Sequence, residues 1–189
     1  MGRIVVTEFV SLDGVVQAPG GGEDFKYAGW TFELNRGEEG DTFKLDETMA
    51  SDALLLGRVT YEGFAAAWPS REGPFADKFN SMPKYVVSST LRDPEWSNTT
   101  VLDGDVREEV AQLKRDQDGD IVVHGSPRLV QALIEHDLVD ELRLMVYPVV
   151  LGTGKRLFGE TRDKKSLRLV DSKIVGDGVA ILIYQPAAA

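Results

Sequence analysis

The chain of 189 residues has no cysteine and only two histidines. The absence of cysteine excludes disulfides and thiol chemistry, and nothing indicates an oxidising compartment. His124 and His136 fall in different predicted elements, so we expect no metal site built from them. No apolar run approaches the roughly 20 residues that cross a membrane, and we expect a cytoplasmic protein that binds no membrane.

Basic residues are also in short supply, with 21 lysines and arginines against 31 aspartates and glutamates and a formal net charge of −10. Nucleic acids and anionic membranes bind basic surfaces, so neither is an expected partner. An anionic ligand would therefore need a local group of arginines. The length fits one domain, which we place at residues 1–186, followed by a disordered tail at residues 187–189.

Three familiar signatures are missing. Gly152-Thr153-Gly154-Lys155 has neither the upstream glycine nor the following Ser or Thr of a phosphate loop. Leu157 stands where the dinucleotide fingerprint Gly-x-Gly-x-x-Gly needs its last glycine. No Gly-x-Ser-x-Gly elbow occurs, which argues against a serine hydrolase.

Apolar segments that alternate with amphipathic ones predict an α/β fold with a mainly parallel sheet. Helices are expected after Asp105, which forms a capping box with Glu108, and from Ser126-Pro127 to about His136. After that helix the strands follow one another directly, with a hairpin turn at residues 176–178, so the C-terminal part should be antiparallel. The predicted strands are Ile4–Val10, Ala53–Leu56, Tyr85–Ser88, Thr99–Leu102, Ile121–His124, Glu141–Leu151, Ser166–Ile174 and Val179–Tyr184.

Small polar and basic residues follow three of these strands. The strand ends are Gly57-Arg58-x-Thr60, Ser88-Ser89 and Gly125-Ser126-x-Arg128. The carboxyl ends of parallel strands lie along one edge of a sheet, where glycine turns and helix starts hold phosphates. Each segment is also explained as a plain turn or helix cap. Taken together they favour a nicotinamide dinucleotide with a 2′-phosphate, for which Arg58 is the partner.

The joint pattern resembles the dihydrofolate reductase superfamily. Within it, the chain is most similar to the reductase domain of the bifunctional riboflavin-biosynthesis deaminase/reductase and its stand-alone relatives. The segments that carry the resemblance are Ser11-Leu12-Asp13-Gly14, Leu56-Gly57-Arg58-x-Thr60-Tyr61-Glu62, Val87-Ser88-Ser89, Leu138-Val139-Asp140-Glu141-Leu142, Pro148-x-x-Leu151-Gly152-x-Gly154 and Leu157-Phe158.

The resemblance implies a dihydrofolate-reductase-like three-layer fold, NADPH as the hydride donor, and a homodimer. It assigns Gly57, Arg58 and Thr60 to the phosphates of the cofactor. Ser88 and Ser89 would bind its adenosine end, and Gly125-Ser126 its pyrophosphate and nicotinamide side. Folate enzymes carry a cis Gly-Gly bond at that last turn, and the sequence leaves open whether Gly125-Ser126 keeps it.

The expected activity is hydride transfer from NADPH to a C=N or C=O bond of a small, heterocyclic, pterin- or aminopyrimidine-like metabolite. The alternative is a nucleotide-binding protein of the same fold without turnover. Asp13 is a candidate catalytic residue, although Asp13-Gly14 is equally well explained as a turn. Of the acids before the Gly57 strand, namely Asp41, Asp46 and Glu47, we favour Asp46, because it shares a helical face with Phe43, Met49 and Ala50.

Substrate contacts are predicted for the loops near the nicotinamide. Asp13 and Gly14 lie after the first strand, and Trp30 belongs to an irregular aromatic segment that is either a lid or core cover. The strand predicted at 141–151 is more apolar than one exposed face allows, which favours a homodimer through the C-terminal strands over coverage by the 126–136 helix alone. Such a dimer would bring Phe158 and the Gly152–Gly154 loop to the mouth of the site.

Overall fold

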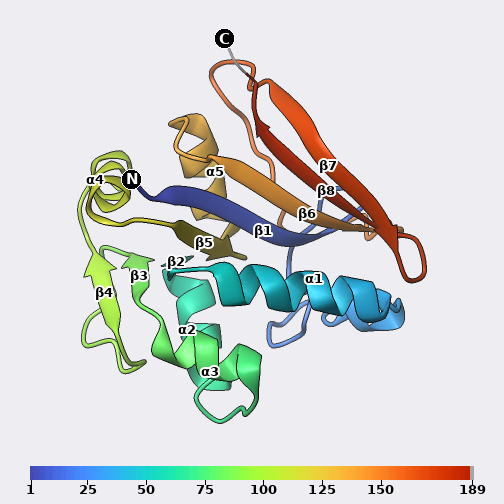
Figure 1. Cartoon of the computed structure of the whole chain (residues 1–189), viewed down its shortest axis with the longest axis horizontal. Coiled ribbons are helices and arrows are strands. Elements are labelled where there is room, and N and C mark those ends of the chain that lie inside the picture. The colour runs from blue at the N-terminus through green and yellow to red at the C-terminus, as the bar shows by residue number, and fades with distance from the viewer. Residues whose placement is uncertain (188–189) are drawn as a thin grey trace.

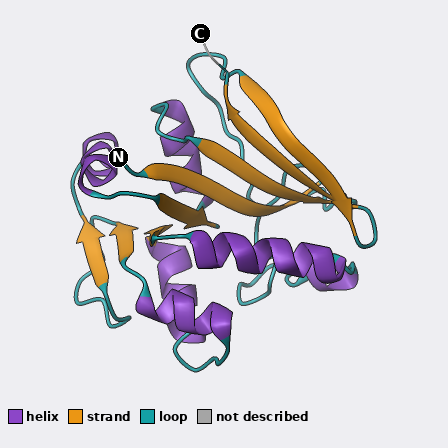
Figure 2. Ribbon diagram, viewed as in Figure 1, coloured by secondary structure: helices purple, strands orange, loops and turns teal. Residues whose placement is uncertain are grey.

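The computed structural model describes residues 1–187, which form one eight-stranded sheet with helices on both faces (Figures 1 and 2). The strand order is β4-β3-β2-β5-β1-β6-β8-β7. The strands are β1 (Arg3–Ser11), β2 (Ala53–Gly57), β3 (Lys84–Val87), β4 (Thr99–Leu102), β5 (Asp120–His124), β6 (Glu141–Tyr147), β7 (Leu167–Val175) and β8 (Val179–Pro186). The helices are η1 (Trp30–Glu33), α1 (Gly37–Ala50), α2 (Arg58–Ala67), α3 (Pro74–Ser81), α4 (Val106–Asp116) and α5 (Pro127–Glu135).

The sheet is parallel from β4 to β6 and antiparallel at its C-terminal end. β1 pairs in parallel with both β5 and β6, whereas β8 runs antiparallel to β6 and to β7. Ala53, Leu54, Leu55 and Leu56 of β2 are fully buried, as expected for a strand covered on both faces. This architecture confirms the predicted α/β fold of the dihydrofolate-reductase type.

Three apolar clusters define the layers. One lies between the sheet and helices α4 and α5, and includes Val6 of β1, Val110 of α4 and Leu133 of α5. The second packs α2 and α3 against the opposite face of β2 and β3. The third, around Trp30 and Tyr147, lies under α1 at the β6-β8 end of the sheet. Successive side chains along a strand point to opposite faces of the sheet and therefore belong to different clusters.

One predicted strand end is wrong, and the two predicted helix caps differ in outcome. The strand expected to reach Leu151 ends at Tyr147, because Pro148 has no N–H to donate and the chain then turns to meet the loop after β1. Ser126 is the N-cap of α5, but its φ of 56° and ψ of 48° leave its side chain without a capping bond. Asp105 caps α4 as predicted, accepting from the amides of Arg107 and Glu108.

The C-terminal tail was predicted to begin at Ala187. The Ala187 amide donates to the Ser166 carbonyl at 2.9 Å, so this residue closes the end of the β7-β8 pair. The prediction for residues 188–189 lies outside the described residues.

Lys84, at the start of β3, is buried, and its ammonium group binds the two segments that lie beside this strand end. Its Nζ donates to the carbonyls of Asn80, Met82 and Ser97 at 2.8–3.0 Å and lies 4.4 Å from the centre of the Trp96 ring. Burial lowers the pKa of Lys84 to about 8. The lysine thus links the end of α3 and the segment before β4 to the start of β3 through hydrogen bonds.

We predict that Lys84→Met lowers the free energy of unfolding by about 1–3 kcal/mol, because three carbonyl groups lose their donor. Urea unfolding followed by circular dichroism measures the change. Lys164→Met, at an exposed lysine, is the control and should leave the midpoint unchanged. Equal midpoints for the parent and Lys84→Met would contradict this role.

Candidate functional site

The ends of β2 and β5 are joined directly. The Gly57 amide donates to Ser126 Oγ at 2.9 Å, and the Ser126 amide donates to Thr60 Oγ1 at 3.0 Å. Ser126 Oγ also donates to the His124 carbonyl at 3.2 Å. The structure therefore brings together two of the three predicted strand ends, at the edge where α2 and α5 begin.

Both helices start at this junction without a side-chain cap within the described chain. Gly125, with a φ of 55°, and Ser126 are both left-handed, and the peptide bond between them is trans, as are all described peptide bonds. The sequence had left that question open. Arg58 is half exposed and pairs with Glu62 at 2.9 Å, and Arg128 is exposed on α5. Two helix N-termini and two arginines thus flank one edge, which is a favourable environment for phosphate.

The third strand end has a more structural character. Ser88 Oγ accepts from the amides of Thr90 and Leu91 at 3.2 and 3.0 Å, and so stabilises the turn after β3. Ser89 is exposed, and its carbonyl accepts from Arg92 at 3.1 Å. Arg92 is a further cation near this edge that the sequence analysis missed, since no recognisable turn motif contains it.

Asp13 is held by hydrogen bonds within the protein. Its carboxylate accepts from Ser11 Oγ at 2.6 Å and from the amides of Leu151 and Gly152 at 3.1 and 2.8 Å, and Arg156 lies 3.6 Å away. The hydroxyl of Ser11 and the two amides lower the pKa of Asp13 to about 2. The structure thus favours the turn interpretation over a proton relay, since Asp13 stays ionised and already binds its neighbours.

The other predicted substrate contacts, Trp30, Gly14 and Phe158, differ in their exposure and in their contacts. Trp30 is buried, donates from Nε1 to the Gln17 carbonyl at 2.9 Å, and packs edge-on against Tyr147 at 5.5 Å, so it is core cover and not a lid. Gly14 forms a turn with a φ of 85°, and its amide donates to Ser11. Phe158 is 49% exposed beside the buried Leu157 and remains available to a ligand.

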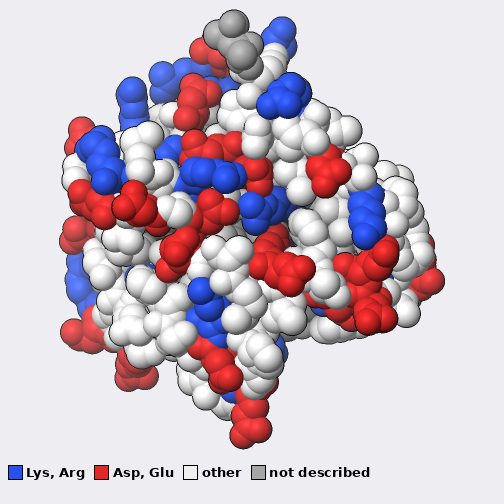
Figure 3. Space-filling model, in the orientation of Figure 1, with Lys and Arg blue, Asp and Glu red and all other residues white. Residues whose placement is uncertain are grey.

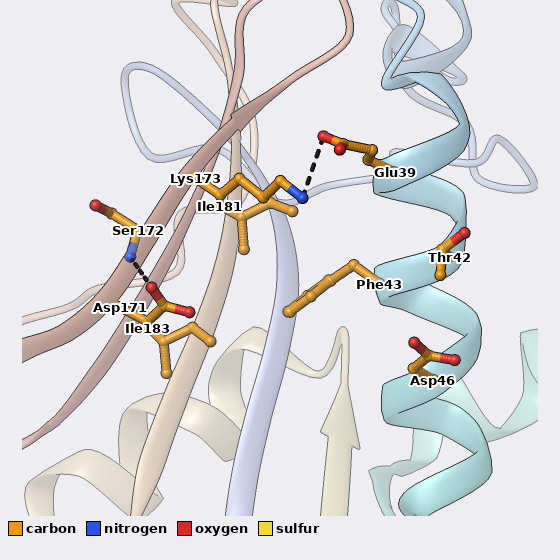
Figure 4. A pocket seen from close by; sticks show the side chains of 9 residues that line it. All are labelled: Glu39, Thr42, Phe43, Asp46, Asp171, Ser172, Lys173, Ile181 and Ile183. Atoms are coloured by element: carbon orange, nitrogen blue, oxygen red, sulfur yellow. Dashed lines mark hydrogen bonds and ion pairs between the residues drawn. The ribbon is translucent and has the colours of Figure 1, made fainter.

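Asp46 does share a helical face with Phe43 and Ala50, and that face lines a cleft. The cleft lies between α1 and strands β7 and β8, where Figure 4 shows Asp46 and Phe43 opposite Ile183. Two strands, β1 and β6, separate β5 from β8, so Asp46 is not brought to the β2-β5 junction. Figure 3 shows acids gathered at the N-terminal end of α1, whose first turn holds Glu38 and Glu39.

The neighbouring acid, Glu47, faces the sheet instead. Its carboxylate accepts from Thr7 Oγ1 at 2.8 Å and pairs with Lys44, and Lys44 Nζ donates to Thr7 at 2.8 Å. This buried network lies on the α1 side of β1, next to His124 of β5. Burial lowers the pKa of His124 well below its usual range, and the Lys44 charge adds to that effect, so its imidazole is neutral at pH 7.

Glu8, which the sequence analysis did not consider, is the most unusual side chain near the junction. It is 4% exposed, and its Oε1 has no hydrogen-bond partner within residues 1–187. The signal was present in the sequence, because a carboxylate interrupts an apolar strand. An orphaned buried oxygen beside the Gly125 turn is consistent with a hydrogen-bonding ligand at this edge of the sheet.

We predict that Asp13→Asn lowers the free energy of unfolding by about 1–2 kcal/mol at pH 7, because a neutral amide is a weaker acceptor for the two amides. The pKa of Asp13 is lower in the folded than in the unfolded chain, so its contribution is present above pH 4 and disappears as the pH falls to about 2. Urea unfolding at pH 7 and pH 2.5 tests both points. The exposed Asp103→Asn serves as control, and a deficit that persists unchanged at low pH would refute the charge-based account.

Among the described residues, no helix has the length and apolarity to cross a membrane, and no cluster of His, Cys, Asp or Glu is suited to a metal. The family described as the RibD C-terminal domain matches residues 3–181. The Bacillus subtilis proteins YyaP and YwjB are 30% and 31% identical, over 96% and 91% of this chain and 94% and 91% of their own lengths.

Two solved structures share the fold. A putative riboflavin biosynthesis protein from Shewanella sp. PV-4 has a TM-score of 0.79 at 22% identity, covering 98% of this chain and 99% of its own. A pyrimidine reductase-like protein from Corynebacterium diphtheriae has a TM-score of 0.63 at 13% identity, covering 99% and 92%. The chain therefore belongs to the RibD C-terminal domain family, which confirms the resemblance to the reductase domain of the riboflavin-biosynthesis deaminase/reductase.

Proposed function

We propose that the protein is an NADPH-dependent reductase that acts on a C=N or C=O bond of a small heterocyclic, pterin- or aminopyrimidine-like metabolite. The observation that carries this proposal is the junction of β2 and β5, where two uncapped helix N-termini meet between Arg58 and Arg128. Membership of a reductase-like family gives independent support. The net charge of −10 makes such a local cationic edge unusual for this chain.

The residues of the junction have distinct roles in this proposal. Gly57 and Gly125 allow the backbone to approach the phosphates, and Arg58 pairs with the 2′-phosphate. Thr60 and Ser126 hold the two strand ends at a fixed separation through their mutual hydrogen bond. Ser88 keeps the turn after β3 in place, so that the exposed Ser89 can contact the adenosine end.

Bound NADPH supplies a hydride from the nicotinamide, and the protein supplies the geometry. Two titratable side chains lie beside the Gly125 turn, His124 and Glu8, one on each face of the sheet. Burial lowers the pKa of His124 and raises that of Glu8, and so favours the uncharged form of each. Neutral donors and acceptors suit an uncharged heterocycle. A fixed charge at the same place would not bind such a heterocycle selectively.

Calorimetric titration with NADPH, followed by NADPH oxidation in the presence of a panel of pterins and aminopyrimidines, tests the proposal. Binding with turnover of at least one member is the expected result. Tight binding without turnover would instead favour a nucleotide-binding protein of the same fold. No binding of NADPH at millimolar concentration would reject the function itself.

Arg58→Ala is predicted to weaken NADPH binding by about ten- to a hundredfold, because one charge-assisted contact to the 2′-phosphate is lost. Its effect on NADH, which lacks that phosphate, should be small. Arg115→Ala, in the last turn of α4, changes the net charge equally and is the control. Equal affinity of the parent protein for NADPH and NADH would end this assignment.

We also infer a homodimer through the C-terminal strands, although for a different reason from the one the sequence indicated. β6 is an interior strand whose Leu142, Leu144 and Met145 are buried within its own chain. The exposed apolar residues lie instead on the edge strand β7, where Leu169 and Ile174 are 47% and 67% exposed. An uncovered apolar edge of this kind favours pairing with a second copy.

Light scattering at micromolar concentration is predicted to give twice the 20.8 kDa mass of one chain. Ile174→Lys should shift the population towards the monomer by adding a charge to the paired edge. Val59→Lys, at an exposed apolar residue of α2, is the control. A parent protein that scatters as a monomer would remove the dimer and any contribution of a partner to the site.

A further inference from the structure

Strand β1 lies between β5 and β6 in the sheet (Figure 1), and Glu8 is the sixth of its nine residues. Its backbone pairs with Leu144 of β6 on one side, and the β1-β5 register of Thr7 with His124 places it beside Gly125 on the other. Its side chain lies on the same face of β1 as Val6 and Val10, which belong to the cluster under α4 and α5. A carboxyl group therefore occupies a position that apolar side chains fill on either side.

The protein leaves one oxygen of the Glu8 carboxyl group without a hydrogen-bond partner within the described residues. Within the described chain, Oε1 is the one buried side-chain oxygen or nitrogen without a hydrogen-bond partner. Burial raises the pKa of Glu8 well above its usual range, and the Lys44 charge and the Gly125 amide offset this only in part. Burial thus favours the protonated form of the group, and Oε1 has unused hydrogen-bonding capacity.

The other buried polar groups show how unusual this is. Lys84 donates to three carbonyls, and Glu47 binds both Thr7 and Lys44. Each of these groups is explained by the fold. Glu8 is not, and it adjoins the Gly125-Ser126 turn at which the proposed cofactor site is built.

The chemistry of Glu8 selects the type of group it would bind. An uncharged carboxyl group offers one O–H donor and one C=O acceptor in the same plane. A primary carboxamide offers the matching acceptor and donor, so the two form a pair of parallel hydrogen bonds. A phosphate has no donor when fully ionised and would favour a cation instead.

We propose that the carboxyl group of Glu8 binds the carboxamide of the nicotinamide ring and so fixes which face of the ring is presented to the substrate. The inference rests on the proposed function, because it assumes that the dinucleotide lies along the β2-β5 edge. It makes Glu8 a positioning residue, since the reacting carbon of the ring is not the group that it contacts.

Binding measurements on three ligands test this assignment. NADP⁺ carries the carboxamide, its 3-acetylpyridine analogue keeps the carbonyl but lacks the N–H donors, and 2′-phospho-ADP-ribose lacks the ring. The parent protein should bind NADP⁺ about tenfold more tightly than the acetylpyridine analogue, which corresponds to one lost hydrogen bond. Calorimetry supplies all three dissociation constants without any need for turnover.

Two substitutions of Glu8 test the hydrogen bonds of its carboxyl group separately from the volume of its side chain. Glu8→Leu should weaken NADP⁺ binding about tenfold, abolish the preference over the analogue, and leave 2′-phospho-ADP-ribose within about twofold of the parent. Glu8→Gln keeps a donor and an acceptor in one plane and should retain most of the NADP⁺ affinity. The thermal midpoint of Glu8→Leu should not fall, because an unsatisfied buried group is removed, and Glu8→Met replaces it if the leucine variant does not fold.

The outcomes distinguish a failure of the role proposed for Glu8 from a failure of the proposed function. If 2′-phospho-ADP-ribose and NADP⁺ both bind but Glu8→Leu weakens them equally or not at all, the role of Glu8 is refuted and the proposed function stands. If none of the three ligands binds the parent protein, the proposed function fails and the role of Glu8 fails with it. Loss of the NADP⁺ preference in Glu8→Leu alone supports both.

Discussion

Ser126 joins the ends of β2 and β5, and the candidate site depends on that junction. Its hydroxyl accepts from the Gly57 amide while its own amide donates to Thr60. These bonds require the left-handed turn at Gly125 and Ser126, which also prevents the hydroxyl from capping α5. A residue that looks like an ordinary helix cap in the sequence is thus used to hold two strands together, and the helix end is left for another acceptor.

Much of the fold was predictable because its strands are buried on both faces. Runs such as Ala53–Leu56 and the cap of α4 have few alternatives, and the parallel pairing of the strands then fixes the edge at which their ends meet. Chain reversals were less predictable. The loop after β6 depends on Asp13, more than a hundred residues earlier in the sequence, which accepts hydrogen bonds from the amides of Leu151 and Gly152.

The candidate site was only partly predictable, since sequence spacing gives the face of a helix but not what the face meets. Asp46 and Phe43 do share a face, yet that face opens towards β7 and β8, and Glu47 is the acid that reaches β1. Trp30 shows the same limit, because an aromatic residue in an irregular segment can serve equally as lid or core. The edge-on contact between Trp30 and Tyr147 shows that it belongs to the core. Glu8 was missed because a single acid in an apolar strand resembles a solvent-facing residue until both faces are known to be covered.

The charge balance gives the site a further constraint. An anionic dinucleotide would approach a protein with a formal net charge of −10, so ionised carboxylates near the phosphates would oppose binding. Asp13 avoids this by pairing with Arg156, and Glu62 by pairing with Arg58. Glu8 has no such cation within hydrogen-bonding distance in the described chain, and its burial disfavours ionisation instead. A carboxyl group in its protonated form can lie next to a phosphate-rich ligand and still form hydrogen bonds with the uncharged end of that ligand.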